Sequence, residues 1–212
     1  MIYFDHNAAT PIAPEVREAM LPFLNDEWGN ASSGYRFGSK NKGVIEAARG
    51  QVARLLGANA REIIFTSCAT ESNDTAIHAA LKANPQKRHV ITSQVEHSSV
   101  LALCQSLKDN GYHITYLGVD RDGLLDVNEL RNAINDETAL VSPMWANNET
   151  GVLFPVQEIG EICRERNVLQ LPKITRRKSG NRYRRFRCLP QFQRLMERNR
   201  VLECGRISRE SR

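Results

Sequence analysis

The sequence predicts an α/β fold with a mainly parallel sheet and flanking helices. Two observations support this expectation. Residues 1–169 alternate regularly between strand-like apolar runs and helix-like periodicity, and three polar segments stand where predicted strands end. Because ligands of open α/β sheets bind outside the carboxyl ends of the strands, the three segments indicate one assembled site.

The elements expected within residues 1–169 are short and regularly spaced. Pro14 favours the first helix because proline suits an initial helical turn, and Gly57 and Gly111 end two later helices. Asp122-Gly123 predicts a turn between a strand and a helix. The expected elements are a strand at 1–5, helices at 14–24 and 43–56, a strand at 62–66, a helix at 70–82, a strand at 89–92, a helix at 98–110, a strand at 113–117, a helix at 127–134, a strand at 138–142 and a helix at 156–166.

Charge divides the chain near residue 169. Of the 212 residues, 41% are hydrophobic, which is ordinary for a globular protein. Residues 170–212 hold 14 Lys and Arg against three Glu, whereas residues 1–169 hold 15 Lys and Arg against 21 Asp and Glu. The α/β pattern is confined to residues 1–169. The basic tail, 170–212, lacks a recurring apolar face and is expected to be mostly disordered.

The sequence predicts no membrane span, no zinc site and no disulfide framework. It has no apolar run long enough to cross a bilayer and no secretory leader. The five cysteines are scattered, odd in number and without CxxC spacing, so a cytoplasmic protein with reduced thiols is expected. Cys68 is expected to behave as a small hydrophobe at the mouth of a buried strand, and Cys104 and Cys163 as packing residues inside helices.

The three polar segments have complementary chemistry. Residues 66–72 open a helix, where the amides of Ala69 and Thr70 are suited to grip a phosphate. His97 follows a strand and is suited to stack on an aromatic cofactor or to transfer a proton. The carboxamides at 147–148 suit a phenolate oxygen or a substrate carboxylate. Each segment also has a purely structural interpretation, as a helix cap, a loop histidine or an Asn-rich turn.

Four blocks of the sequence resemble the front half of the pyridoxal-phosphate cysteine desulfurases, especially the NifS type of iron–sulfur and nitrogenase maturation. The blocks are 3–10 (YFDHNAAT), 65–72 (FTSCATES), 95–97 (VEH) and 144–151 (MWANNETG), and the resemblance covers about residues 2–169. It implies the large domain of pyridoxal-phosphate fold type I, and a homodimer.

The resemblance also implies roles for individual residues. Ala69 and Thr70 are expected to bind the phosphate of pyridoxal 5'-phosphate, His97 to stack on the ring and act in catalysis, and Asn148 to contact the ring hydroxyl. The family reaction takes sulfur from L-cysteine, which leaves alanine and a persulfide for an iron–sulfur scaffold or another sulfur acceptor.

The resemblance ends after residue 169. The family's Asp-Ala-Val-Gln segment, whose Asp pairs with the pyridinium nitrogen, falls here on 173–176 (KITR), which inverts the charge. The family's Schiff-base lysine, carboxylate-binding arginine and nucleophilic cysteine have no counterpart in 170–212. We therefore expect a truncated and catalytically incomplete chain, with a tail read from a shifted frame. Sequencing the gene tests this hypothesis, because an intact second half in another frame supports it and the absence of one refutes it.

Two other interpretations stay open. One is another class V enzyme with the same cofactor, such as a selenocysteine lyase, although block 144–151 favours the NifS type. The other is a protein whose basic tail binds nucleic acid, through phosphate neutralisation and through stacking by Tyr183, Phe186 and Phe192. The tail contains no recognised nucleic-acid-binding motif, so we do not expect nucleic acid to be a partner.

Overall fold

The structure is a computed structural model that describes residues 2–3, 5–6 and 8–171. The described residues form two compact units, which meet in sequence between Phe65 and Thr66. We call residues 2–65 the helical unit and residues 66–171 the sheet unit. The tail expected to be disordered lies outside the described residues, apart from its first two positions.

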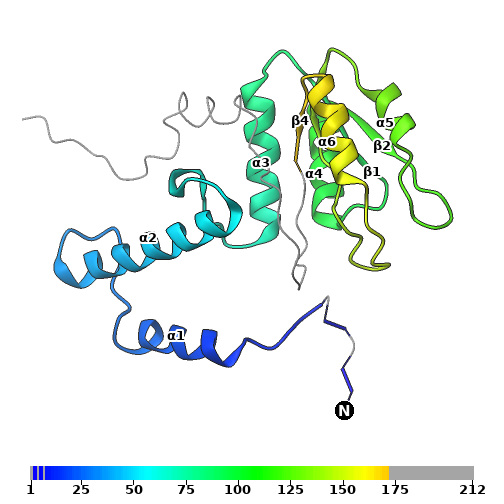
Figure 1. Ribbon diagram of the computed structural model, residues 1–212. Helices are drawn as coiled ribbons and strands as arrows, with labels where there is room; N and C mark the ends of the chain where they lie inside the picture. Colours follow the sequence, from blue (N-terminus) through cyan, green and yellow to red (C-terminus); the bar gives the residue numbers. More distant parts are fainter. Residues whose placement is uncertain (1, 4, 7, 172–212) are drawn as a thin grey trace, which may run out of the picture. The chain divides into compact units, whose positions relative to one another are not determined.

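A four-stranded parallel sheet forms the centre of the sheet unit (Figure 1). The strands are β1 (His89–Ser93), β2 (His113–Leu117), β3 (Thr138–Val141) and β4 (Leu169–Gln170), in the spatial order β2-β1-β3-β4. The register places Val90 beside Ile114 on one side and beside Leu140 on the other. Every residue of β1 and β3 is buried, as expected for inner strands covered on both faces.

Four helices cover the sheet: α3 (Ala69–Ala83), α4 (Ser98–Asp109), α5 (Val127–Ala133) and α6 (Val156–Glu165). Helix α3 packs against α4, and α5 packs against α6. One core cluster joins Ile91 and Val141 of the strands to Leu130 of α5 and Ile159 of α6. The buried residues of α3 and α4 include Ile77 and Val100. The predicted α/β fold with flanking helices is confirmed.

The sequence located most elements of the sheet unit to within one or two residues, because apolar periodicity and the end signals agree there. Strand β4 was not predicted, and it consists of two residues only. Gly123 has the positive φ of 79° that its predicted turn requires.

The strand expected at 62–66 is wrong. Ala60–Glu62 forms the 3₁₀ helix η1, in which Asn59 and Glu62 make a capping box. Ile63 has an extended backbone, with φ −96° and ψ 124°, but residues 63–66 pair with no strand among the described residues. A strand needs a ladder partner as well as β-branched residues. The strand expected at 1–5 is likewise not seen at residues 2, 3 and 5.

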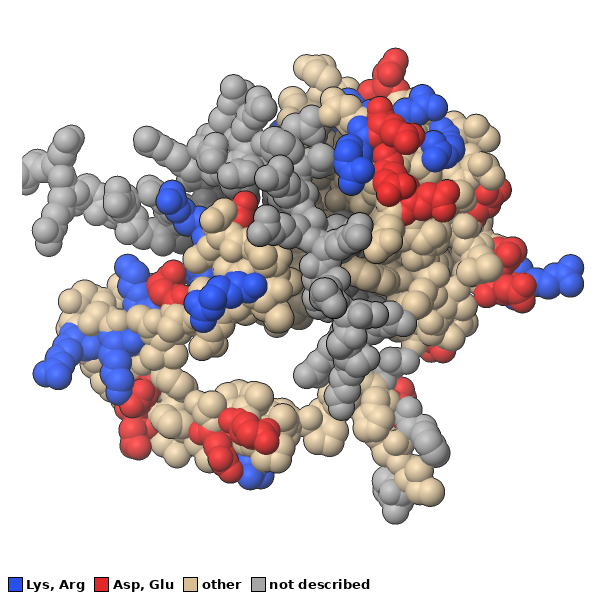
Figure 2. Space-filling view, in the orientation of Figure 1, with Lys and Arg blue, Asp and Glu red and all other residues tan. Residues whose placement is uncertain are grey.

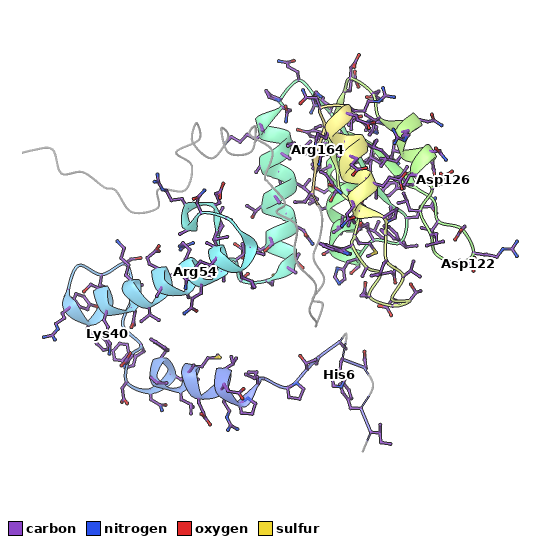
Figure 3. The ribbon with its side chains drawn as sticks, viewed as in Figure 1. His6, Lys40, Arg54, Asp122, Asp126 and Arg164 are labelled. Carbon is purple, nitrogen blue, oxygen red and sulfur yellow. The ribbon has the colours of Figure 1, made fainter. Side chains whose placement is uncertain are left out.

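The helical unit contains α1 (Pro14–Asn25) and α2 (Arg36–Leu56). Helix α2 begins well before the predicted start near residue 43. Asn41 explains part of this extension, because its Nδ2 donates to the carbonyls of Glu27 and Gly29, both at 2.6 Å. Lys40, which is labelled in Figure 3, lies one turn into α2 and pairs with Glu27 at 2.5 Å. These polar contacts hold the chain that precedes α2 against its first turns.

Charged residues of both signs are mixed over the face drawn in Figure 2. The sheet unit holds eight Lys and Arg against fourteen Asp and Glu, so the acidic character of residues 1–169 belongs to this unit. No helix among the described residues is long and apolar enough to span a membrane.

Candidate functional site

The carboxyl ends of β1 and β3 form the topological switch point of the sheet. The chain that leaves β1 enters α4, which packs beside α3, and the chain that leaves β3 leads to α6, which packs beside α5. Neighbouring strands whose connections turn to opposite faces mark the place where open α/β sheets bind ligands. His97 lies on the first of these connections, and Asn148 lies on the second.

A carboxamide joins the two connections. Asn147 Nδ2 donates to the carbonyl of Val95 over 3.2 Å. Asn147 Oδ1 accepts the backbone N–H groups of Glu149 and Thr150, both at 2.9 Å. The structure therefore brings together the segments that carry His97 and Asn148, which lie about fifty residues apart in the sequence.

His97 is the N-cap residue of α4 and is exposed. Its Nδ1 accepts the backbone N–H of Ser99 over 3.2 Å and lies 2.8 Å from the Ser99 hydroxyl oxygen. A ring nitrogen that accepts a proton donor carries no proton of its own, so the neutral ring has its proton on Nε2. His97 is thus oriented by its own helix start.

The segment 66–72 reaches the same edge of the sheet. Helix α3 begins at Ala69 and leads through a short turn into β1. Because α3 and β1 run in opposite directions, the first turn of α3 lies towards the carboxyl end of β1 (Figure 1). Ala69 and Thr70 are the first two residues of this helix, where backbone N–H groups have no partner within the helix. Such a position favours an anion.

Cys68 is the N-cap residue of α3, and hydrogen bonds at this turn change the pKa of its thiol. The backbone amide of Glu71, followed by the Ser67 hydroxyl, lowers the pKa of the Cys68 thiol below its ordinary value. Hydrogen-bond donors at this turn therefore favour the thiolate over the thiol. The expectation that Cys68 is a buried small hydrophobe is wrong, because its side chain is exposed.

The other two described cysteines are packing residues, as predicted. Cys104 and Cys163 are both buried. Burial raises the pKa of the Cys163 thiol to about 12, because the thiolate loses its hydration in the core. The Cys163 thiol is therefore not a nucleophile at neutral pH.

Asn148 is half-buried, and its Nδ2 donates to Glu149 Oε1 over 2.6 Å. The donors gathered at this edge are backbone N–H groups, a threonine hydroxyl, a carboxamide and an imidazole N–H. This set matches a phosphate attached to a hydroxyl-bearing aromatic ring, so the residues present fit pyridoxal phosphate.

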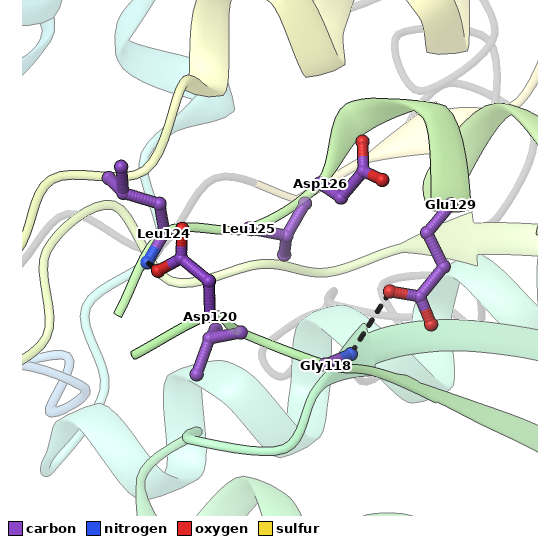
Figure 4. Close-up of a pocket in the computed structure, with 7 residues that line it drawn as sticks. Gly118, Asp120, Leu124, Leu125, Asp126 and Glu129 are labelled. Atoms are coloured by element: carbon purple, nitrogen blue, oxygen red, sulfur yellow. Dashed lines mark hydrogen bonds between the residues drawn. The ribbon is translucent and has the colours of Figure 1, made fainter. Parts of the chain in front are cut away.

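A separate hollow lies beside the carboxyl end of β2 (Figure 4). Its volume is about 260 Å³, and Gly118, Asp120, Asp126 and Glu129 are among its lining residues. Glu129 Oε2 accepts the Gly118 N–H over 3.3 Å, and Asp126 caps α5. These carboxylates disfavour an anion, and among the described residues no group of His, Cys, Asp or Glu is arranged to hold a metal ion. The hollow is therefore a poor candidate for the phosphate.

Sequence reasoning missed the contacts that two residues make near the site. Asn147 was grouped with Asn148 as a possible ligand or turn residue, and its cross-loop bond depends on a fold that brings Val95 near. Ser99 had a local signal, since a hydroxyl two residues after a helix N-cap is well placed to bond the capping side chain.

Comparison with known proteins agrees with this geometry. The family model for "Aminotransferase class-V" matches residues 2–171. The chain is 54% identical over 160 residues to "Cysteine desulfurase 2" of Trichormus variabilis, which covers 76% of this chain and 40% of that protein. It is 48% identical over 169 residues to "Cysteine desulfurase IscS" of Rickettsia bellii, which covers 79% of this chain and 41% of that protein.

Solved structures show the same likeness. A structure described as "NIFS-LIKE PROTEIN" superposes with a TM-score of 0.79 at 35% identity and covers 83% of this chain and 49% of that chain. "SspA in complex with cysteine" superposes with a TM-score of 0.76 at 37% identity, and the match covers 80% of this chain and 49% of that chain. The chain spans about two fifths of the length of the curated relatives it matches.

The sheet, its flanking helices and the switch-point site define part of the large domain of pyridoxal-phosphate fold type I. The chain belongs to the aminotransferase class V family. Cysteine desulfurases of this family use pyridoxal phosphate, in agreement with the cofactor predicted from the four sequence blocks.

Proposed function

We propose that residues 2–171 form the amino-terminal portion of a cysteine desulfurase site, which acts on L-cysteine with pyridoxal 5'-phosphate. The observation that carries this proposal is the hydrogen bond from Asn147 to Val95, because it joins two of the three predicted segments at the switch point. The relatives named as cysteine desulfurases, at about half identity over most of this chain, support the same activity.

Each predicted residue has a distinct task in this proposal. The first-turn amides of α3 at Ala69 and Thr70, with the Thr70 hydroxyl, hold the phosphate. His97, oriented by Ser99, stacks on the cofactor ring and transfers a proton. Asn148 offers its carboxamide to the ring hydroxyl. When bound, the cofactor supplies an electron sink for bond cleavage next to the substrate nitrogen.

The chain as given is proposed to be catalytically incomplete. We propose that the cofactor portion is 1–169 and that 170–212 is an unrelated basic tail, and the family match over residues 2–171 supports this division. None of the described residues is a lysine in the context of the family's Schiff base. A cytoplasmic location and transfer of sulfur to an iron–sulfur scaffold or another acceptor belong to the same proposal, as does the family's homodimer.

The test is equilibrium dialysis of the full chain against pyridoxal 5'-phosphate, with pyridoxal as the phosphate-free comparison. We expect saturable binding of the phosphorylated compound and at least about tenfold weaker binding of pyridoxal, because hydrogen bonds to a charged group contribute about 1.5–3 kcal/mol. Thr70→Ala is expected to weaken binding of the phosphorylated compound by about tenfold.

Thr75→Ala is the matched control, because Thr75 is exposed on the same helix, beyond its first turn. Equal binding of the two compounds, or equal losses in the two threonine variants, would contradict the phosphate site.

Borohydride reduction followed by mass mapping separately tests whether the chain is catalytically incomplete. A single lysine modified in stoichiometric yield would show that the chain supplies its own Schiff base.

A further inference from the structure

The Asn147 side chain uses its two ends in different loops. Its carbonyl oxygen accepts the N–H groups of Glu149 and Thr150 and so shapes the loop after β3. The backbone N–H of Asn147 closes the same loop by donating to the Val152 carbonyl over 2.9 Å. The amide nitrogen of the side chain lies 3.6 Å from Met144 Sδ within the loop and also reaches out of the loop, to the Val95 carbonyl over 3.2 Å. A local turn requires the bonds that the Asn147 carbonyl oxygen accepts, but it does not require the bond to Val95.

The outward bond lies beyond the end of the sheet ladder. The Ser142 N–H donates to the Ile91 carbonyl over 2.8 Å, and Thr92 Oγ1 donates to the Ser142 carbonyl over 2.9 Å. Past these bonds the two connections diverge towards opposite faces of the sheet. The Asn147 bond ties them together again, through Asn147, one residue before Asn148, and Val95, two residues before His97.

We propose that Asn147 is a positioning residue of the cofactor site, whose carboxamide fixes the loop that carries Asn148 against the segment that carries His97. The proposal rests on the proposed function, because it concerns the same site. Its physical basis is that a ligand held from two sides binds best when the two sides are already spaced correctly. Only a side chain that both accepts and donates performs the two functions at once, and a carboxamide does so.

The substitution Asn147→Asp separates the two functions. A carboxylate still accepts the N–H groups of Glu149 and Thr150, so the turn is preserved, but it cannot donate to the Val95 carbonyl. Asn135→Asp is the matched control. Asn135 Oδ1 accepts the Glu137 N–H over 3.0 Å in a similar turn, before β3 and therefore at the opposite end of the sheet.

The experiment compares the full-length parent, N147D and N135D by nuclear magnetic resonance and by dialysis against pyridoxal 5'-phosphate. In N147D we expect the His97 ring resonances and the amides of 95–97 to shift, while the amides of Glu149 and Thr150 keep their protection from exchange. We also expect affinity for pyridoxal 5'-phosphate to fall by about three- to tenfold, the range of one net hydrogen bond. N135D is expected to leave the His97 signals and the affinity unchanged.

Two results would overturn the proposal. Unshifted His97 signals in N147D would show that the bond does not couple the loops, and shifted signals with parental affinity would show that the coupling does not serve the site. A parent chain that binds no pyridoxal 5'-phosphate would instead refute the proposed function, and the resonances would still decide whether the loops are coupled. A variant that merely loses stability would lower the free energy of unfolding without moving the His97 ring.

Discussion

The sheet unit and the helical unit of this chain are stabilised in different ways. Among the residues that the structure describes, all but one of the buried hydrophobic residues lie in the sheet unit, and the exception is Ala53 of α2. Helix α1 has no buried residue at all. In the helical unit the best-defined contacts are polar, such as the Asn41 bonds to Glu27 and Gly29 and the bond from Arg49 to the Ile63 carbonyl at 2.5 Å.

This difference indicates which unit has a core that can stabilise its own fold. Burial of apolar surface is the dominant favourable contribution to folding, so a unit with a closed core holds its own shape. The helical unit instead exposes large apolar side chains, including Leu24 at 69%, Trp28 at 71% and Leu55 at 70%. The sheet unit is therefore expected to unfold cooperatively and the helical unit to exchange its amide protons more easily.

The strongest test of the comparison pairs the same substitution in the two units. Leu130→Ala in α5 removes a side chain with no exposed surface and is expected to lower the free energy of unfolding by about 2–5 kcal/mol. Leu24→Ala in α1 removes an exposed side chain and is expected to change it by less than about 0.5 kcal/mol. Urea unfolding followed by circular dichroism measures both. Similar losses in the two variants would show that the helical unit has a core of its own.

A smaller effect is expected from close packing at the start of α2. A Cβ atom at Gly38 would lie 2.1 Å from the Asn30 carbonyl oxygen, so Gly38→Ala must displace backbone and is expected to cost about 1–3 kcal/mol. Gly43→Ala in the same helix meets open space and is expected to stabilise by about 0.5–1 kcal/mol. Hydrogen exchange of α2 amides measures both variants. Equal effects would indicate that the first turns of α2 do not pack on residues 27–33.

The smallest expected effect concerns pH and the sheet unit alone. His89 is buried between Thr138, 2.8 Å from Nδ1, and Thr115, 2.8 Å from Nε2. Burial, followed by the nearby charge of His113, lowers the pKa of His89, and the Asn135 side chain and then Glu137 oppose this shift. The unfolded chain therefore binds a proton more readily than the folded chain. Stability is complete above the unfolded pKa of about 6.5 and declines as the pH falls below it.

Urea unfolding of the sheet unit at several pH values between about 5 and 8 measures this decline, which for one proton cannot exceed about 1.4 kcal/mol per pH unit. His89→Gln is expected to flatten the profile, and His78→Gln, a change on the exposed surface of α3, to leave it as in the parent. A profile that stays steep in the His89 variant would assign the pH dependence to other groups.

The contrast between the units also explains what the sequence could predict. Strand 113–117 and helix 156–166 were located closely because each carries its own apolar pattern and end signals. The segment 62–66 has the composition of a strand but lacks a ladder partner among the described residues, and no local pattern reveals that. The early start of α2 depends on contacts of Gly38 and Asn41 that are specific to the folded chain.

The candidate site shows the same division. The helix start at 69–70, His97 and the carboxamides at 147–148 were singled out because each follows an expected strand or opens a helix, which is a local property, whereas their individual roles are implied by the family resemblance. The tie from Asn147 to Val95 depends on how two distant connections meet, and no spacing in the sequence encodes that distance. The exposure of Cys68 was also missed, because an unpaired segment precedes it where a buried strand was expected.

The strand order β2-β1-β3-β4 has a consequence for synthesis on the ribosome. The first strand to emerge, β1, occupies an inner position, and its second partner is made only when the chain reaches Thr138. At a translation rate of about 5–20 residues per second, this edge of β1 waits roughly 2 to 10 seconds for β3. During that interval the nascent chain exposes an unpaired, apolar strand edge at Val90 and Ile91. A chaperone that binds unpaired strand edges would protect the chain most during this interval.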